Sequence, residues 1–225
     1  MFIRAALLSL AVTAAPVAAQ TPRELLTQAS FHDRDKAAAM RRVQAAHAAA
    51  TAQLRRDPND REAALMQATA LGYRAKLTGS RGDALAARRA MEALVAAHPR
   101  SAEGQLALGA WHMGAVHRLG RFVARAALGA SKPVGLSALD RAVALGGARA
   151  FFPGIAALLR LEQDPKDSRA RALAEAAAKG ATPTALDRQL QQAARAVLVP
   201  LNAGDVATTR RTAARLLPLG WVEEH

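Results

Sequence analysis

The segment 108–131 concentrates residue types that could bind a ligand or a metal ion. It reads LGAWHMGAVHRLGRFVARAALGAS, with one tryptophan, two histidines and three arginines. His112 and His117 are five positions apart, so on a regular helix their side chains diverge by about 140°. They form no HExxH pattern, and neither has a carboxylate at the next turn. We therefore expect no metal site, a packing role for His112 and a surface position for His117.

The three arginines, Arg118, Arg121 and Arg125, follow the spacing i, i+3 and i+7. If the helix runs on through them, they form one basic stripe beside an apolar one that includes Phe122 and Val123. One interpretation is a solvated face over an ordinary core. The other is a docking surface for an acidic protein segment or an anionic head group, because arginine suits bidentate contacts with carboxylate and phosphate.

The chain offers no recognisable catalytic motif. Ser131 lies in GASKP, which matches neither a GxSxG nucleophile nor a phosphate-binding loop. The carboxylates Glu103, Asp140, Glu162 and Glu175 stand alone in the sequence. The absence of cysteine excludes thiolate metal sites and cysteine nucleophiles. These observations predict a protein that is not an enzyme and that carries no cofactor.

Composition and periodicity predict an all-α fold. Alanine, leucine and arginine, which favour helices, are abundant, and aromatic residues make up 4% of the chain. No segment alternates apolar and polar residues over the length of a strand. Turn sequences separate about nine expected helices, with N-caps at Asp60, Ser101, Asp167, Thr182 and Asp205. Pro200 and Pro218 are expected at helix ends. We expect antiparallel helix pairs stacked into one domain over residues 20–225.

A repeat pattern occupies the middle of the chain. Leu71-Gly72 is followed by Gly82-Asp83 at a turn, then Ala87, Met91, Leu94 and a closing Pro99, and nine residues later comes Leu108-Gly109. This pattern resembles the tetratricopeptide repeat. Small residues such as Gly72 and Gly109 allow helices to approach closely. After Trp111 the next repeat helix is delayed, which predicts a helical insertion near residues 118–134.

The delayed unit, with Leu108-Gly109, Trp111 and Gly129-Ala130-Ser131, resembles the repeat domain of the regulator-of-microtubule-dynamics family. It also resembles tetratricopeptide-like proteins found with some bacterial transporters. The resemblance covers about residues 57–165 and implies a stacked superhelix with a concave face, but no catalytic residues. Side chains of first helices in such repeats lie near the concave face. The candidate binding residues are therefore Tyr73, Trp111, His112, Arg118, Arg121 and Arg125. For Trp111 we favour a position in the core over one in the groove.

Residues 1–19 have the pattern of a cleavable signal peptide. Arg4 precedes an apolar stretch that is shorter than the roughly 20 residues of a membrane span, and Val17-Ala18-Ala19 forms the cleavage signal. No later segment is apolar enough to cross a bilayer. We expect an exported protein that resides in the periplasm if its source cell has two membranes.

The formal net charge of +13 suggests anionic partners. Anionic lipid and envelope polyanions fit, whereas no block of lysine and arginine of the nucleic-acid-binding kind is present. A genome-wide bias toward arginine and alanine codons would give the same composition.

Three functions remain open on sequence grounds. The one that we favour is a scaffold that holds a protein or peptide partner in its concave face and on its basic arm, and it predicts a polar, open groove. The second is a solute- or lipid-binding accessory protein, such as one that serves a transporter, and it predicts an apolar pocket near the arm. The third is an enzyme, which predicts a convergent set of ionisable groups.

Overall fold

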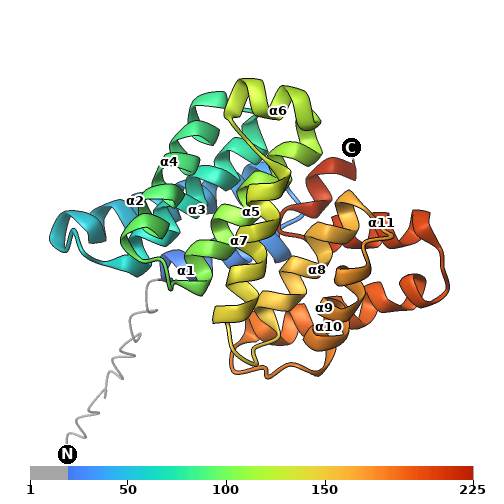
Figure 1. Ribbon diagram of the computed structural model, residues 1–225. Coiled ribbons are helices and arrows are strands. Elements are labelled where there is room, and N and C mark those ends of the chain that lie inside the picture. Colours follow the sequence, from blue (N-terminus) through green and yellow to red (C-terminus); the bar gives the residue numbers. More distant parts are fainter. Residues whose placement is uncertain (1–19, 225) are drawn as a thin grey trace, which may run out of the picture.

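The computed structural model describes residues 20–224, and over this range the protein is all-α, as predicted (Figure 1). Eleven α-helices are present among these residues, two more than the sequence pattern indicates. The two additional helices are α1, at the start of the described chain, and α6, which lies within the helical insertion predicted near residues 118–134. The predicted signal peptide, residues 1–19, lies outside the described residues.

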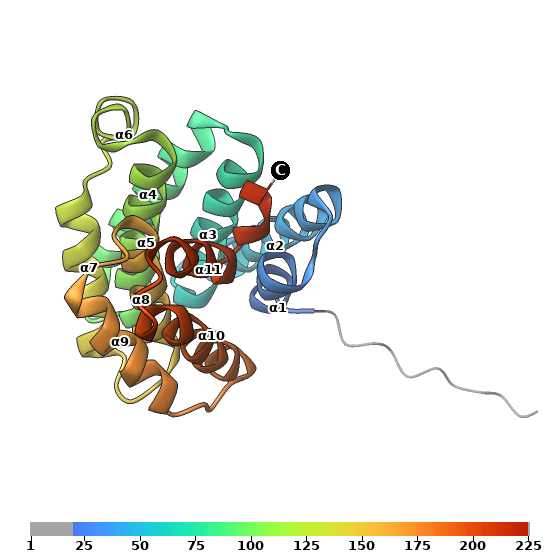
Figure 2. The same cartoon turned by 90° about the vertical axis from the view of Figure 1, so that its right-hand side faces the viewer.

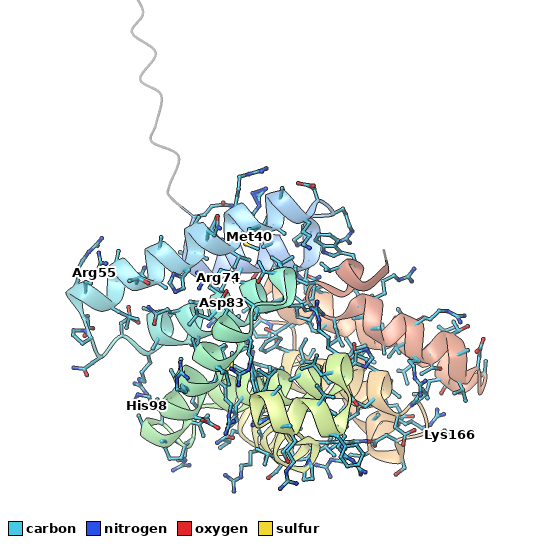
Figure 3. All side chains as sticks on the ribbon, turned by 90° about the horizontal axis from the view of Figure 1, so that it is seen from above. Met40, Arg55, Arg74, Asp83, His98 and Lys166 are labelled. Carbon is cyan, nitrogen blue, oxygen red and sulfur yellow. The ribbon has the colours of Figure 1, made fainter. Side chains whose placement is uncertain are left out.

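The N-terminal half begins with a helical segment that precedes the first expected helix. Its elements are α1 (Pro22–Thr27), η1 (Gln28–His32), α2 (Lys36–Arg56), α3 (Arg61–Thr78) and α4 (Arg81–Ala97). Successive helices pack against each other, and α1 also contacts both α2 and α3. Between α3 and α4, Arg74 donates from Nε to Asp83 Oδ2 at 2.7 Å, and Figure 3 shows the two side chains facing each other.

The insertion forms between two closely packed helices. Its elements are α5 (Ala102–Leu119), α6 (Arg121–Leu128) and α7 (Lys132–Leu145). Gly120 has φ +74°, which favours glycine, and it separates α5 from α6. The expected single stripe of arginines is therefore wrong, because Arg118 belongs to α5 whereas Arg121 and Arg125 belong to α6.

Glycines allow α5 and α7 to pack tightly across this insertion. A Cβ atom on Gly109 would lie 2.9 Å from Cδ2 of Leu139 and 3.0 Å from the carbonyl oxygen of Gly135. A Cβ on Gly135 would lie 3.0 Å from Cβ of His112. The small residue at position 109 thus has the packing role that the repeat pattern predicts.

The C-terminal half consists of helices that share one core. Its elements are α8 (Phe151–Gln163), α9 (Ser168–Lys179), α10 (Ala185–Asn202), α11 (Val206–Leu216) and η2 (Gly220–Glu224). The helix α8 is almost entirely buried, because α5, α7, α9, α10 and α11 all pack against it. Pro200 lies inside α10, two residues before its end, and not at the boundary that we expected.

Local capping signals place most helix starts. Asp60, Ser101 and Asp205 each accept a hydrogen bond from a backbone N–H in the first turn of the helix that follows, as predicted. Asp167 caps α9 in the same way. The expected cap at Thr182 is wrong, because Thr184 caps α10 and forms a capping box with Asp187.

After α11 the chain returns to the N-terminal helices. Leu219 and Trp221 are buried in one cluster with residues of α1, α2 and α3. The Leu219 N–H donates to the carbonyl oxygen of Ser30 at 2.8 Å. Figure 2 shows this C-terminal end lying beside α3. We call residues 217–222 the C-terminal strap.

Among the described helices, none combines the length and the apolar character that a membrane span requires.

Candidate functional site

A large apolar cavity lies where the inner faces of α1, α3, α5 and α8 meet. Its volume is about 510 Å³, within the range of about 300–1,000 Å³ that is typical of small-molecule sites. Carbon atoms make up most of its surface, and it is partly open to solvent. The cavity is therefore the principal candidate site in the described part of the chain.

Helix α5 supplies one wall through a regular stripe of side chains. Its lining residues recur every three or four positions from Glu103 to Arg118, so they lie on one face of the helix. Three of the central positions, Ala107, Ala110 and Gly114, have small side chains or none. A Cβ on Gly114 would meet no atom within 4 Å. Small residues on this face thus create the empty volume.

Larger apolar side chains supply the other walls at the same helical spacing. Helix α3 contributes Leu65, Met66 and Tyr73, and α8 contributes Ile155 and Leu159. The C-terminal strap adds Leu217 and Pro218. Its attachment includes a hydrogen bond from Lys76 Nζ to the Pro218 carbonyl oxygen at 3.2 Å. The strap thereby covers a surface that helix stacking alone would leave open.

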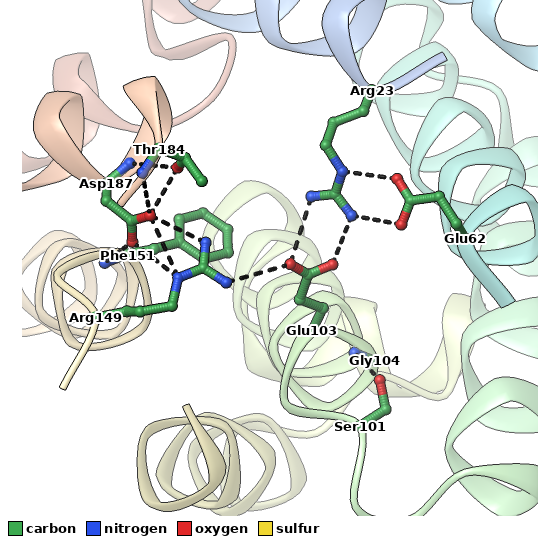
Figure 4. A network of polar contacts seen from close by, with 9 residues as sticks. All are labelled: Arg23, Glu62, Ser101, Glu103, Gly104, Arg149, Phe151, Thr184 and Asp187. Atoms are coloured by element: carbon green, nitrogen blue, oxygen red, sulfur yellow. Dashed lines mark hydrogen bonds and ion pairs between the residues drawn. The ribbon is translucent and has the colours of Figure 1, made fainter. Parts of the chain in front are cut away.

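Polar groups gather near the two ends of α5, where Glu103 and His117 are about 21 Å apart along the helix axis. At the first end, Arg23 donates from Nη2 to Glu62 and to Glu103, in each case at 2.6 Å (Figure 4). Hydrogen bonds to these two carboxylates raise the pKa of Arg23, although burial opposes the rise. Glu103 also lies 3.9 Å from Nη1 of Arg149.

The ion-pair network continues from Arg149 to a buried carboxylate. Arg149 Nη2 donates to Asp187 at 3.1 Å, and Asp187 also accepts from Thr184 and from the Phe151 N–H (Figure 4). Burial acts to raise the pKa of Asp187, but these hydrogen bonds outweigh it and lower that pKa. The network joins α1, α3, α5 and α10, and its carboxylates are used in ion pairs and hydrogen bonds between these elements.

The second end of the cavity lies at the ends of α3 and α5, next to α6. Here Arg118 Nη1 donates to the Lys76 carbonyl oxygen at 2.7 Å, and Arg81 Nε donates to the Ala127 carbonyl oxygen at 3.1 Å. Among the described residues, neither arginine forms an ion pair with a carboxylate. His117 Nε2 lies 3.8 Å from the buried Glu162, and both residues line this end. The two arginines give this end a positive charge beside an apolar wall.

Of the six candidate binding residues, three line the cavity. Tyr73 lies on its wall, and burial raises the pKa of its hydroxyl to about 12, although a hydrogen bond with Ser30 opposes that rise. Trp111 also lies on the wall, with its Nε1–H donating to the Ala84 carbonyl oxygen at 3.0 Å. Arg118 lines the second end, as described above.

The other three candidates lie outside the cavity. His112 is buried between α5 and α7, where its Nδ1 accepts from the Ser131 N–H at 3.2 Å. Burial, with the nearby Arg88 guanidinium, lowers the pKa of His112, which favours the neutral imidazole that this bond requires. Arg121 and Arg125 are exposed on α6 and do not line the cavity.

Two of the carboxylates singled out in the sequence, Glu103 and Asp140, have structural partners. No three histidine, aspartate or glutamate side chains among residues 20–222 are grouped as metal ligands. Asp140 pairs with Arg160 at 2.7 Å and Glu103 with Arg23, so both carboxylates are engaged in ion pairs.

Sequence reasoning missed most of the cavity. Residues of α1, η1 and the C-terminal strap were not expected near a site, and Phe31 and Leu217 are examples. The stripe of small residues on α5 was the one local signal that could have indicated a hollow face. No protein-family model, curated protein or solved structure gives a significant match to this chain.

Proposed function

We propose that the protein binds an amphiphile with a long apolar chain, such as a fatty acid, and that it does so without catalysis. The observation that carries this proposal is the apolar cavity of about 510 Å³ along α5. Its length, set by about 21 Å between Glu103 and His117, suits an extended acyl chain. This function corresponds to the solute- or lipid-binding alternative and not to the peptide scaffold first favoured by the sequence.

The chemistry of the lining is the reason for this preference. A site for a peptide needs polar groups along its length, because each buried peptide group must keep its hydrogen bonds. The middle of the cavity offers apolar walls, formed by residues such as Leu106, Ile155 and Leu159. Such walls exclude backbone groups and accept hydrocarbon.

The proposed head-group site lies at the α6 end. Arg81 and Arg118 both line the cavity there, and both have donors that are not used in ion pairs with described carboxylates. A carboxylate or phosphate would accept from them. At the opposite end Arg23 is already bound by Glu62 and Glu103, which makes that end unattractive to an anion.

Two glycine substitutions test the cavity with a matched control. Gly114→Leu would place a side chain in the empty space, while Gly82→Leu adds the same side chain on an exposed turn of α4. Both changes replace glycine within a helix, so both favour helix formation by up to about 1 kcal/mol. We expect a fluorescent fatty acid to bind the wild type and Gly82→Leu, and to bind Gly114→Leu at least tenfold more weakly.

The head-group proposal has a separate test. Arg81→Gln with Arg118→Gln should weaken binding of the fatty acid about tenfold and leave binding of the corresponding alcohol unchanged. If none of these ligands binds the purified, delipidated protein, the proposal fails. Saturable binding of a peptide that Gly114→Leu leaves intact would restore the scaffold hypothesis.

Export remains part of this proposal. The signal-peptide pattern of residues 1–19 would take the protein out of the cytoplasm. In the periplasm a lipid-binding accessory protein could serve a transporter. The resemblance to tetratricopeptide repeats likewise stays a prediction. The stacked helix pairs are compatible with it.

A further inference from the structure

Helix α6 presents an unusual outer face. Phe122 is 77% exposed and Val123 is 56% exposed, whereas Ala124 and Leu128 on the opposite side are buried. With 100° of rotation per residue, Phe122 lies near the centre of the exposed arc. Arg121 and Arg125 flank it on one side, and the Arg121 guanidinium lies 4.7 Å from the Phe122 ring centroid. Cationic and large apolar side chains therefore share one solvent-facing surface.

The stretch of sequence that contains α6 carries charge of one sign. Residues 104–139 contain no aspartate or glutamate, whereas they contain three arginines and one lysine. Among the described residues, Arg121 and Arg125 form no ion pair. The surface is therefore complementary to an anionic one.

The face is held firmly in place. Helix α6 is attached to α4 by arginines that donate to its last carbonyl groups, Arg81 to Ala127 at 3.1 Å and Arg88 to Leu128 at 2.8 Å. Three of its residues, Val123, Ala127 and Leu128, also line the cavity. Because Val123 both lines the cavity and is exposed, the cavity reaches the surface beside α6.

We propose that α6 docks the protein on a bilayer surface that contains anionic phospholipid. Arg121 and Arg125 would contact the head groups, and Phe122 would enter the boundary between head groups and acyl chains. An acidic protein segment would satisfy the arginines, but it would leave Phe122 and the adjacent cavity opening unexplained. Docking itself does not require a ligand in the cavity. Transfer of such a ligand between the cavity and the membrane would rest on the proposed function.

Vesicle co-sedimentation tests the charged part of the proposal. We expect the protein to bind vesicles of phosphatidylcholine with phosphatidylglycerol, and not vesicles of phosphatidylcholine alone. Arg121→Gln with Arg125→Gln should weaken binding about thirtyfold, since each basic residue near such a surface contributes about fivefold. Arg55→Gln with Arg56→Gln, at the far end of α2 (Figure 3), changes the net charge equally and should retain binding.

The apolar part has its own matched pair. Phe122→Ser should weaken binding to anionic vesicles about tenfold or more, because the variant has no large apolar side chain to transfer from water into the bilayer. Val199→Ser, at a site 70% exposed on α10, should have no such effect. Phe122→Trp should show a blue-shifted emission with anionic vesicles, whereas Val199→Trp should not.

The outcomes separate docking from ligand binding. Without vesicles, the α6 variants should bind the fluorescent fatty acid like the wild type, and Gly114→Leu should still sediment with vesicles. Equal vesicle binding by Phe122→Ser and Val199→Ser would overturn the docking proposal and leave the cavity proposal intact. Binding of an acidic peptide through Arg121 and Arg125, with no binding of vesicles, would overturn it in favour of a protein partner.

Discussion

Arginines of the same charge have opposite surroundings in two regions of this molecule. Arg149, between α7 and α8, is paired with carboxylates from two helices, Glu103 of α5 and Asp187 of α10, and Asp187 is fully buried. On α6, Arg121 and Arg125 are exposed and form no ion pair with described residues, and no carboxylate occurs in the sequence from residue 104 to residue 139. The comparison shows that net charge alone does not identify a binding surface, because pairing decides which arginines hold the fold and which are free to meet a partner.

The largest expected effect is at the buried end of the Arg149 network. Asp187→Ala should lower the free energy of unfolding by about 3–5 kcal/mol, because the half-buried Arg149 guanidinium, the Phe151 N–H and the Thr184 hydroxyl lose their shared acceptor. Urea unfolding followed by circular dichroism measures this. The control is Asp205→Ala, which removes an exposed N-cap and should cost about 1 kcal/mol. Equal losses in the two variants would contradict the special role of the buried carboxylate.

A smaller effect is expected at a second paired arginine. Arg160 is 5% exposed and donates to Asp140 at 2.7 Å and to Asp167 at 3.1 Å. Arg160→Met should lower the free energy of unfolding by about 1–3 kcal/mol. Arg169→Met removes a more exposed partner of the same Asp140 and should cost less than about 1 kcal/mol. Urea unfolding measures both losses. A loss for Arg169→Met as large as that for Arg160→Met would contradict this prediction.

Acid should weaken the paired region selectively. The lowered pKa of Asp187 means that its stabilising effect is complete above its ordinary value of 3.8 and disappears as the pH falls through the folded-state pKa. The difference in unfolding free energy between wild type and Asp187→Asn should therefore be large near neutral pH. Unfolding curves at a series of acid pH values should show that this difference decreases as the pH falls. A difference that does not change with pH would contradict the role given to the Asp187 carboxylate.

The smallest effect on stability is expected on α6. Arg121→Gln with Arg125→Gln should change the free energy of unfolding by less than about 0.5 kcal/mol, since exposed and unpaired side chains contribute little. Thermal unfolding of this variant beside the wild type measures it. A clear loss would show that these arginines support the fold, and would remove the contrast with Arg149.

Local signals in the sequence were sufficient for most of the helices. Caps such as Asp60 and Ser101 satisfy the first N–H groups of a helix, and this chemistry depends on residues within one turn. Gly109 was predictable as a close-packing position because small residues at helical spacing indicate contact between helices. Pro200 was misplaced because a proline near the end of a helix disturbs few backbone hydrogen bonds, so α10 accommodates it.

The cavity could be predicted only in part. Trp111 and Tyr73 were expected near a concave face, and both line the cavity. The strap that covers it was not expected, because Leu219 reaches α1 and α3 through contacts that no periodicity reveals. The ion pair between Arg23 and Glu103 spans 80 positions, and its charge pattern in sequence is no different from that of solvated residues.

The C-terminal strap also changes how the protein should unfold. A linear stack of helix pairs has free ends, so it can lose its terminal pairs one at a time. Here the strap joins the last helix to the first ones, with Lys76 and Pro218 bonded across 142 positions. Neither end can separate without breaking contacts of the other. The described residues therefore form a closed circuit of contacts, in which unfolding of the two ends is a single cooperative event.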